Sequence, residues 1–196
     1  MKKRTISIIV VVGIVLLVML LSVSKYNGFV KKDEACLKQW SAVESQYQRR
    51  LDLIPNLVST VKGYASHEQE TFTEVIKARN QAMQVKISSK NITQEGLNEL
   101  QTTQDNLSSA LQKLNVVVER YPELKANQNF LELQSQLEGT ENRIAVERKR
   151  FAEIVEEFNA SIRRFPANII ANLFGFERKA YFESQKGAEN APKAEF

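Results

Sequence analysis

The chain has 196 residues, of which 43% are hydrophobic and 26% are charged, and its formal net charge is +4. Lys2, Lys3 and Arg4 supply three of the 27 basic residues, which leaves 24 basic against 23 acidic residues in the rest of the chain. This near balance does not support a basic nucleic-acid-binding surface. The single cysteine, Cys36, excludes an internal disulfide and a thiolate metal cluster, and we expect no metal, cofactor or nucleic acid.

An apolar run opens the sequence. It extends over the 18 residues Ile6–Val23, and no charged residue occurs between Arg4 and Lys25. About 20 apolar residues are enough to span a bilayer as a helix, and the run exceeds the ~7–15 apolar residues of a typical signal peptide. A cleaved signal peptide is the alternative, because Ser22 and Ser24 have the spacing of a cleavage site, but the length favours an uncleaved anchor.

The flanking charges predict an orientation. Residues 1–4 form a short basic tail and residues 5–24 the transmembrane anchor, and basic residues are enriched on the cytoplasmic side of such spans. Lys25, Lys31 and Lys32 on the far side weaken the bias. We expect a single-pass protein of the cytoplasmic (inner) membrane, with its N-terminus inside and the remainder outside the cytoplasm.

Two long helices are predicted, over about residues 27–65 and 127–165, because apolar residues recur in both at every seventh position. The first repeat consists of Trp40, Tyr47, Ile54 and Val61. The second consists of Phe130, Leu137, Ile144, Phe151, Phe158 and Phe165. A seven-residue repeat is typical of helices that pack along a seam, as in a coiled coil.

Two further helices are predicted between them, over about residues 67–88 and 94–120. Ser66 with Gln69 fits a capping box for the first, and Thr93 is the expected N-cap of the second. The residues expected to face inward are Phe72, Ile76, Met83, Leu97, Leu100, Leu107, Leu111, Leu114 and Val118.

Together these elements predict an all-α fold. Four helices with short connections favour an elongated antiparallel four-helix bundle after the transmembrane helix. We place this bundle domain at residues 25–176. Residues 177–196 form a C-terminal tail, which we expect to be partly disordered.

Arg50 stands on the apolar seam of the first helix, where a charged group is costly unless it is paired. Antiparallel alignment of the first and last helices places residue 50 near residue 145, between Glu141 and Glu147. We therefore predict an ion pair between Arg50 and a glutamate, with Asn142, Arg143 and Arg79 close to it.

A polar layer of this kind typically fixes helix register, and we favour that role over catalysis. The alternative is an enzyme with a buried site made of Arg50, Glu141 and Glu147. His67 is the only histidine and lies near a helix end, so the sequence offers no activated nucleophile and no metal-ligand spacing. Pro55 removes a backbone hydrogen bond to the carbonyl of residue 51 and is expected to bend the first helix.

The lower end of the bundle is expected to lie at the lipid surface. Antiparallel packing brings the segment FPANIIANLFGF to the level at which the first helix leaves the membrane. Basic residues around apolar ones suit anionic lipid. The residues assigned to this membrane-proximal region are Lys25, Lys31, Lys32, Arg163, Arg164, Leu173, Phe174 and Arg178. The alternative is that the apolar segment closes the bottom of the core.

Several blocks of the chain resemble the LemA family. They are VESQYQRRLDLIPNLVSTVKGYASHE, ENRIAVERKRFAEIVEEFNASIRRFP, LFGFERKAYF and the closing APKAEF, and they follow an N-terminal anchor in the family's order. The resemblance implies a membrane-anchored helical bundle and supplies no catalytic residues. It also implies membrane-associated tasks, since relatives include proteins of magnetosome membrane formation and some are encoded near a membrane zinc metallopeptidase.

Two functions follow as expectations. The first is a non-enzymatic interaction or scaffold protein at the cell envelope, with membrane lipid as one partner and a second copy or envelope proteins as others. The second is an enzyme, or an accessory to one such as a membrane peptidase. We favour the first.

Overall fold

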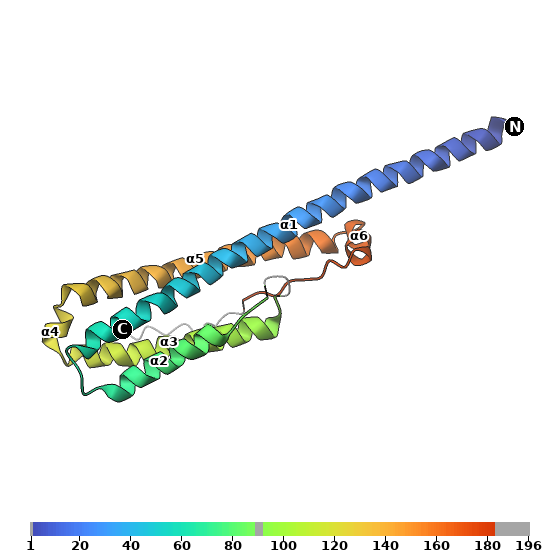
Figure 1. The fold of residues 1–196 in the computed structure, drawn as a ribbon. Coiled ribbons are helices and arrows are strands. Elements are labelled where there is room, and N and C mark those ends of the chain that lie inside the picture. The colour runs from blue at the N-terminus through green and yellow to red at the C-terminus, as the bar shows by residue number, and fades with distance from the viewer. Residues whose placement is uncertain (1, 89–91, 183–196) are drawn as a thin grey trace, which may run out of the picture. The chain divides into compact units, whose positions relative to one another are not determined.

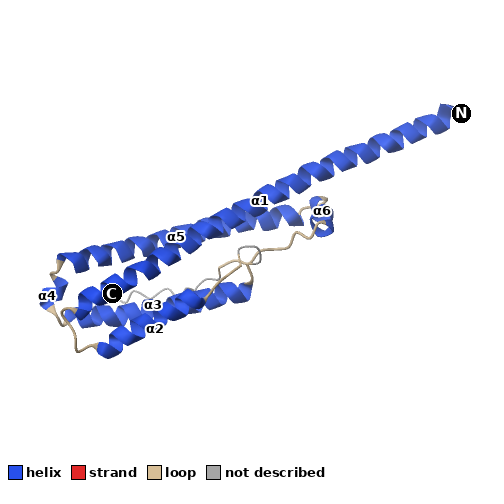
Figure 2. Cartoon of the chain, in the orientation of Figure 1, coloured by secondary structure: helices blue, strands red, loops and turns tan. Residues whose placement is uncertain are grey.

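The computed structural model of the chain describes residues 2–88 and 92–182. Within these ranges the chain forms helices joined by loops and turns and contains no strand (Figure 2), so the predicted all-α class is confirmed. The helices, labelled in Figure 1, are α1 (Lys2–Lys62), α2 (Gln69–Gln84), α3 (Gln94–Glu119), α4 (Pro122–Lys125), α5 (Gln128–Arg163) and α6 (Ala167–Leu173).

The apolar segment and the first bundle helix form one uninterrupted helix, α1. Except at residue 18, which is not described, the large apolar side chains between Ile6 and Val23 are exposed, from 51% for Val12 to 70% for Leu20. This segment is long and apolar enough to cross a membrane, and it is the one such segment among the described residues. A helix satisfies its own backbone hydrogen bonds, which is the condition for a segment surrounded by lipid.

The chain divides into two compact units, which are described separately. Of the described residues, the first unit contains residues 2–40 and Arg150–Lys179. The second contains residues 41–88, 92–149 and 180–182. Both α1 and α5 contribute to each unit.

Four helices share one apolar core in the second unit. Side chains of α1, α2, α3 and α5 form a single cluster, to which Leu124 of α4 also belongs. Ile54, Val75, Leu114 and Phe130 represent the four long helices in it, and each is at most 2% exposed. The predicted packing of four helices is therefore present in this unit.

Aromatic packing between α1 and α5 forms the core of the first unit. The Trp40 and Phe151 rings meet edge to face, with centroids 5.4 Å apart. Cys36 is fully buried, and its Sγ donates to the carbonyl of Ile154 at 3.9 Å. Phe158 continues the aromatic row at 1% exposure.

The predicted ion pair between Arg50 and a glutamate of α5 is confirmed, but the register between α1 and α5 differs by about one helical turn from the predicted alignment. The alignment placed residue 50 near residue 145, whereas Arg50 contacts Glu141, four residues earlier. A shift of one turn leaves an apolar stripe facing its neighbour in almost the same way. The repeats in the two helices therefore could not distinguish these registers.

Two predicted positions at the end of α5 and the start of α2 also differ. Phe165 was expected inside the bundle, but it is 82% exposed because α5 ends at Arg163, so Phe165 no longer follows the inward face. The predicted capping box is absent, since the N-cap of α2 is Glu68 and the Gln69 side chain donates to the Ser66 carbonyl at 2.7 Å.

Helices α2 and α3 lie side by side in Figure 1. Thr93 caps α3 as predicted, accepting from the Gly96 N–H at 3.2 Å. The predicted inward position of Met83 was wrong, because this side chain is 44% exposed. The buried residues of α2 are Phe72, Val75, Ala78 and Ala82.

Candidate functional site

The polar layer of the second unit consists of Arg50, Gln104, Ser108 and Glu141, with Arg50 at its centre. Arg50 is 3% exposed, and its Nε lies 2.7 Å from Glu141 Oε1. The Nε–H is not directed at this oxygen, so the contact is an ion pair and not a hydrogen bond. Arg50 Nη1 donates to Gln104 Oε1 at 3.0 Å, and Nη2 donates to Ser108 Oγ at 2.7 Å. One guanidinium therefore links α1, α3 and α5.

Burial and neighbouring negative charge shift the pKa of Arg50 in opposite directions. Removal from water lowers the pKa of Arg50, and the Glu141 carboxylate opposes this by favouring the charged form. Glu141 reaches solvent, with 46% of its side chain exposed. Tyr47 lies close by, and burial raises the pKa of its phenol while Arg148 and Arg50 lower it. The carboxylate of Glu141 is thus the largest of the charges that favour the buried cation, and Asp105 adds to it.

Arg79, which was expected near this layer, has a different partner. Its Nε donates to the backbone carbonyl of Leu51 at 2.8 Å. Leu51 is four residues before Pro55, and proline has no N–H to bond with that carbonyl. Arg79 therefore supplies the donor that Pro55 lacks.

The other predicted members of the layer lie along α5. Arg143 Nη2 donates to Thr140 Oγ1 at 3.3 Å. Asn142 is exposed and Glu147 is half-buried. Of the two glutamates considered from the sequence, Glu141 is the one in ion-pair contact with Arg50.

The sequence contained a signal for Gln104 that the prediction missed. Gln104 lies four residues after Leu100 and three before Leu107, which places it on the apolar stripe of α3. It is 5% exposed. A polar residue on such a stripe indicates a buried partner, and Arg50 occupies the same kind of position on α1.

A cavity of about 290 Å³ lies beside the layer, within the second unit. Arg50, Ser108, Glu138 and Glu141 line it together with apolar residues. Ser108 Oγ donates to the Gln104 carbonyl at 3.0 Å and accepts from Arg50. Its proton is therefore directed at a carbonyl and not at a general base, as nucleophilic catalysis would require.

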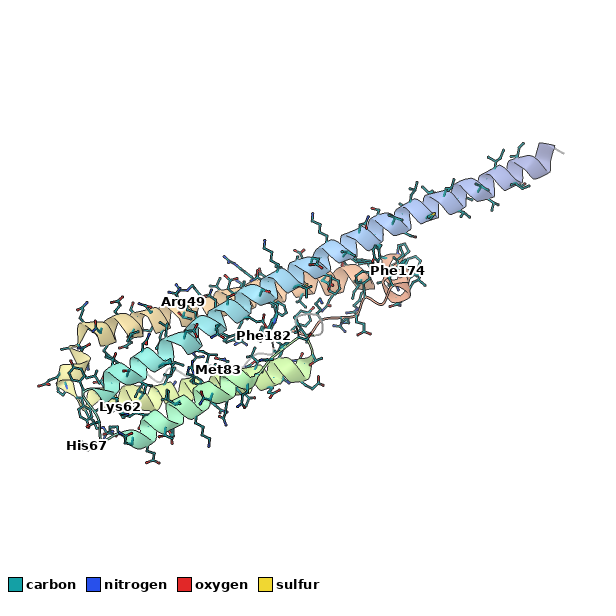
Figure 3. The ribbon with its side chains drawn as sticks, viewed as in Figure 1. Arg49, Lys62, His67, Met83, Phe174 and Phe182 are labelled. Carbon is teal, nitrogen blue, oxygen red and sulfur yellow. The ribbon has the colours of Figure 1, made fainter. Side chains whose placement is uncertain are left out.

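Within the part of the chain that the structure describes, no metal-ligand cluster lies beside the cavity, whose ionisable lining residues are Arg50, Glu138 and Glu141. His67, which is labelled in Figure 3, is exposed in the turn between α1 and α2. The described residues contain no group of three His, Cys, Asp or Glu side chains that could hold a metal ion. The contacts of Arg50 join α1, α3 and α5.

The predicted membrane-proximal cations belong to the first unit. Lys25, Lys31, Arg163, Arg164 and Arg178 are exposed. Lys32 is half-buried, and its Nζ lies 3.6 Å from Glu157 Oε2.

The apolar segment after α5 exposes its large side chains. Leu173 is 77% and Phe174 55% exposed, and Ile169 is 58% exposed. The residues of α6 that pack inward are Ala167 and Ala171, at 7% and 1% exposure. Ile170 is half-buried, and the half-buried Phe176 ring packs against Phe29 and Phe158, so the segment exposes some of its large residues and also contributes to the core.

Packing also extends beyond residue 176, through a contact that the sequence did not indicate. The Asn159 side chain donates to the Lys179 carbonyl and accepts from the Lys179 N–H, both at 2.9 Å. Lys179 Nζ lies 2.7 Å from Asp33 Oδ1. Asn159 is 2% exposed, so the backbone of Lys179 is hydrogen-bonded to a buried side chain of the first unit. Residues 183–196, which include the end expected to be poorly ordered, lie outside the described residues.

Comparison with known proteins identifies relatives of this chain. Residues 39–196 match the LemA family. The chain is 26% identical over 185 residues to magnetosome protein MamQ 2 of Paramagnetospirillum magneticum, covering 86% of this chain and 68% of that protein. It is 25% identical over 185 residues to magnetosome protein MamQ of Magnetospirillum gryphiswaldense, with the same coverage. It is 23% identical over 164 residues to protein LemA of Metamycoplasma hominis, covering 84% of this chain and 71% of that protein.

Proposed function

Since the chain belongs to the LemA family, we propose that it is a single-pass membrane protein that acts as a non-enzymatic interaction or scaffold protein at the cell envelope. The N-terminus lies in the cytoplasm, and the helical bundle lies outside it. The bundle presents helix surfaces to a second copy or to envelope proteins.

The observation that carries this proposal is the continuity of α1 within the first unit. The exposed apolar segment continues without a loop into residues 25–40, and this part of α1 packs against α5 through Cys36 and Trp40. A span joined in this way holds the first unit next to the membrane. The polar layer supports a non-enzymatic role, because Arg50 and Ser108 are engaged in contacts between helices.

The topology is testable by labelling a cysteine in intact cells. The native thiol is a poor target, because Cys36 is buried and burial raises its pKa to about 11. Cys36→Ser removes it, and Gln84→Cys places a new thiol at the exposed end of α2. A membrane-impermeant maleimide should then label the chain without lysis.

A cysteine in a short tag ahead of Met1 is the matched reporter for the other side. It should react only after lysis. If Gln84→Cys reacted only after lysis while the tag reacted in intact cells, the proposed orientation would be reversed, and the search for partners would move to the cytosol.

A further inference from the structure

Helix α6 packs in the reverse of the usual pattern. A surface helix normally buries its large apolar side chains and exposes polar ones. Here Ala167 and Ala171 face inward while Ile169 and Leu173, also four residues apart, face outward. Phe165 and Phe174 add two exposed rings at either end of this helix. An exposed apolar patch of this kind indicates a surface that something else covers.

Aromatic contacts fix the position of this patch along α1. The Phe174 ring lies 4.8 Å from the Tyr26 ring, and Figure 3 shows Phe174 beside α1. The Phe176 ring lies 5.7 Å from Tyr26 and 5.4 Å from Phe29. The end of α6 is thus attached to the part of α1 that directly follows the apolar segment.

The distance from the apolar segment to this contact is short. Tyr26 is three residues beyond Val23, and a helix rises 1.5 Å per residue, so the two are about 5 Å apart along α1. The headgroup layer on each side of a bilayer is of similar thickness, about 5–8 Å. If α1 spans the membrane, Phe174 lies at the level of the headgroups, where aromatic residues are enriched.

The basic residues around the patch are suited to the headgroup layer of a membrane. Lys25, Arg163, Arg164 and Arg178 are exposed, and Glu177 is the one acidic residue between positions 163 and 178. Long basic side chains can extend to lipid phosphates while their neighbours enter the acyl region.

We propose that α6, with Phe165, Ile169, Leu173 and Phe174, inserts into the outer surface of the membrane that α1 spans, and that the flanking arginines bind anionic lipid headgroups. This second lipid contact rests on the proposed membrane anchor. It would hold the base of the first unit against the bilayer at two points.

The test uses nitroxide labels on the full chain in vesicles of 30% phosphatidylglycerol and 70% phosphatidylcholine. Leu173→Cys in the Cys36→Ser background carries the label, and Ile169→Cys gives a second reading. Both positions are exposed, so the label should not disturb packing. The ratio of oxygen to nickel-complex accessibility reports depth, because oxygen concentrates in lipid and the nickel complex in water.

Two control positions separate the possible failures. Leu16→Cys lies in the apolar segment and reports the anchor itself, and Met83→Cys is an exposed apolar position on α2. We expect the ratio at residues 173 and 169 to be several-fold higher than at residue 83 and below that at residue 16.

A high ratio at residue 16 with a value at residues 169 and 173 equal to that at residue 83 would overturn this inference and leave the anchor intact. A low ratio at residue 16 would overturn the anchor as well. Spin–spin broadening at residue 173 that disappears on dilution with unlabelled chain would show that a second copy, and not lipid, covers the patch.

Discussion

The contribution of Arg50 depends on the groups that compensate for its burial. An isolated charge in a protein core is strongly unfavourable, and the usual response is pairing. Arg50 has one charged partner in Glu141 and two neutral ones in Gln104 and Ser108. We propose that this layer contributes specificity of helix pairing more than net stability.

Glu141→Gln should destabilise the bundle. It removes the carboxylate in contact with Arg50 and leaves the more weakly acting Asp105 as a compensating charge, at a cost of about 1–2 kcal/mol, since Glu141 itself reaches solvent. For a chain of this size we expect the melting temperature to fall by about 2–8 °C. The measurement is thermal unfolding of the full chain in nanodiscs, followed by circular dichroism.

The matched control is Glu138→Gln, an exposed glutamate that lines the same cavity one turn earlier on α5. It should melt within about 1–2 °C of the parent, as surface substitutions usually do. Equal melting temperatures for the two variants would mean that the ion pair does not hold the layer together.

The sequence predicted that Arg50 needs a partner but not which one. The seven-residue repeat places Arg50 on the seam, and the same reasoning would have found Gln104. The choice between Glu141 and Glu147 depends on the register of α1 against α5, which periodicity leaves undetermined to within a turn. In the observed register of α1 against α5, the Trp40 ring packs edge to face on the Phe151 ring.

At the scale of elements, Pro55 and Arg79 form a compensating pair. The helix continues through Pro55, although proline leaves the Leu51 carbonyl without its helical donor. Arg79 on α2 donates to that carbonyl. The carbonyl that Pro55 leaves unpaired in α1 thus accepts a hydrogen bond from α2, and this bond joins the two helices.

A double-mutant cycle tests this pairing. Arg79→Met should cost about 1 kcal/mol in unfolding free energy, because it leaves the Leu51 carbonyl without its donor. In the Pro55→Ala background the new N–H can bond to that carbonyl, so the cost of Arg79→Met should shrink by about 0.5–1 kcal/mol.

Lys77→Met is the control for this cycle, since Lys77 is an exposed basic residue on the same helix. Its effect should be small and the same in both backgrounds. An equal cost of Arg79→Met with and without Pro55 would show that Arg79 stabilises α2 for another reason.

The long helices were predictable because a repeat over many residues averages out local irregularities. The short ones were not, since α4 and α6 have four and seven residues and contain too few turns to show a period. The buried face of α2 was misjudged for a different reason. The predicted face was centred on Phe72, Ile76 and Met83, whereas the buried face includes Ala78 and Ala82, whose small side chains let the helices approach closely.

For the whole molecule, the central claim is that α1 anchors the chain in a membrane. The large apolar side chains described in its first part do not pack into the protein core, since at least half of the surface of each is exposed. Lipid is the environment in which such a helix is stable. The α6 patch takes its proposed role from this anchor.

The most direct measurement is alkaline carbonate extraction of membranes from cells that make the full chain. We predict that the chain stays in the membrane pellet. Val12→Lys with Leu16→Lys should release it to the soluble fraction, because each charge at the centre of a span costs about 2.5–3.5 kcal/mol.

Val116→Lys with Leu131→Lys is the matched control, since it places the same two charges at exposed apolar positions of α3 and α5. This variant should remain in the pellet. Release of the unmodified chain by carbonate, or retention of the Val12→Lys and Leu16→Lys variant, would contradict the claim that α1 spans the membrane.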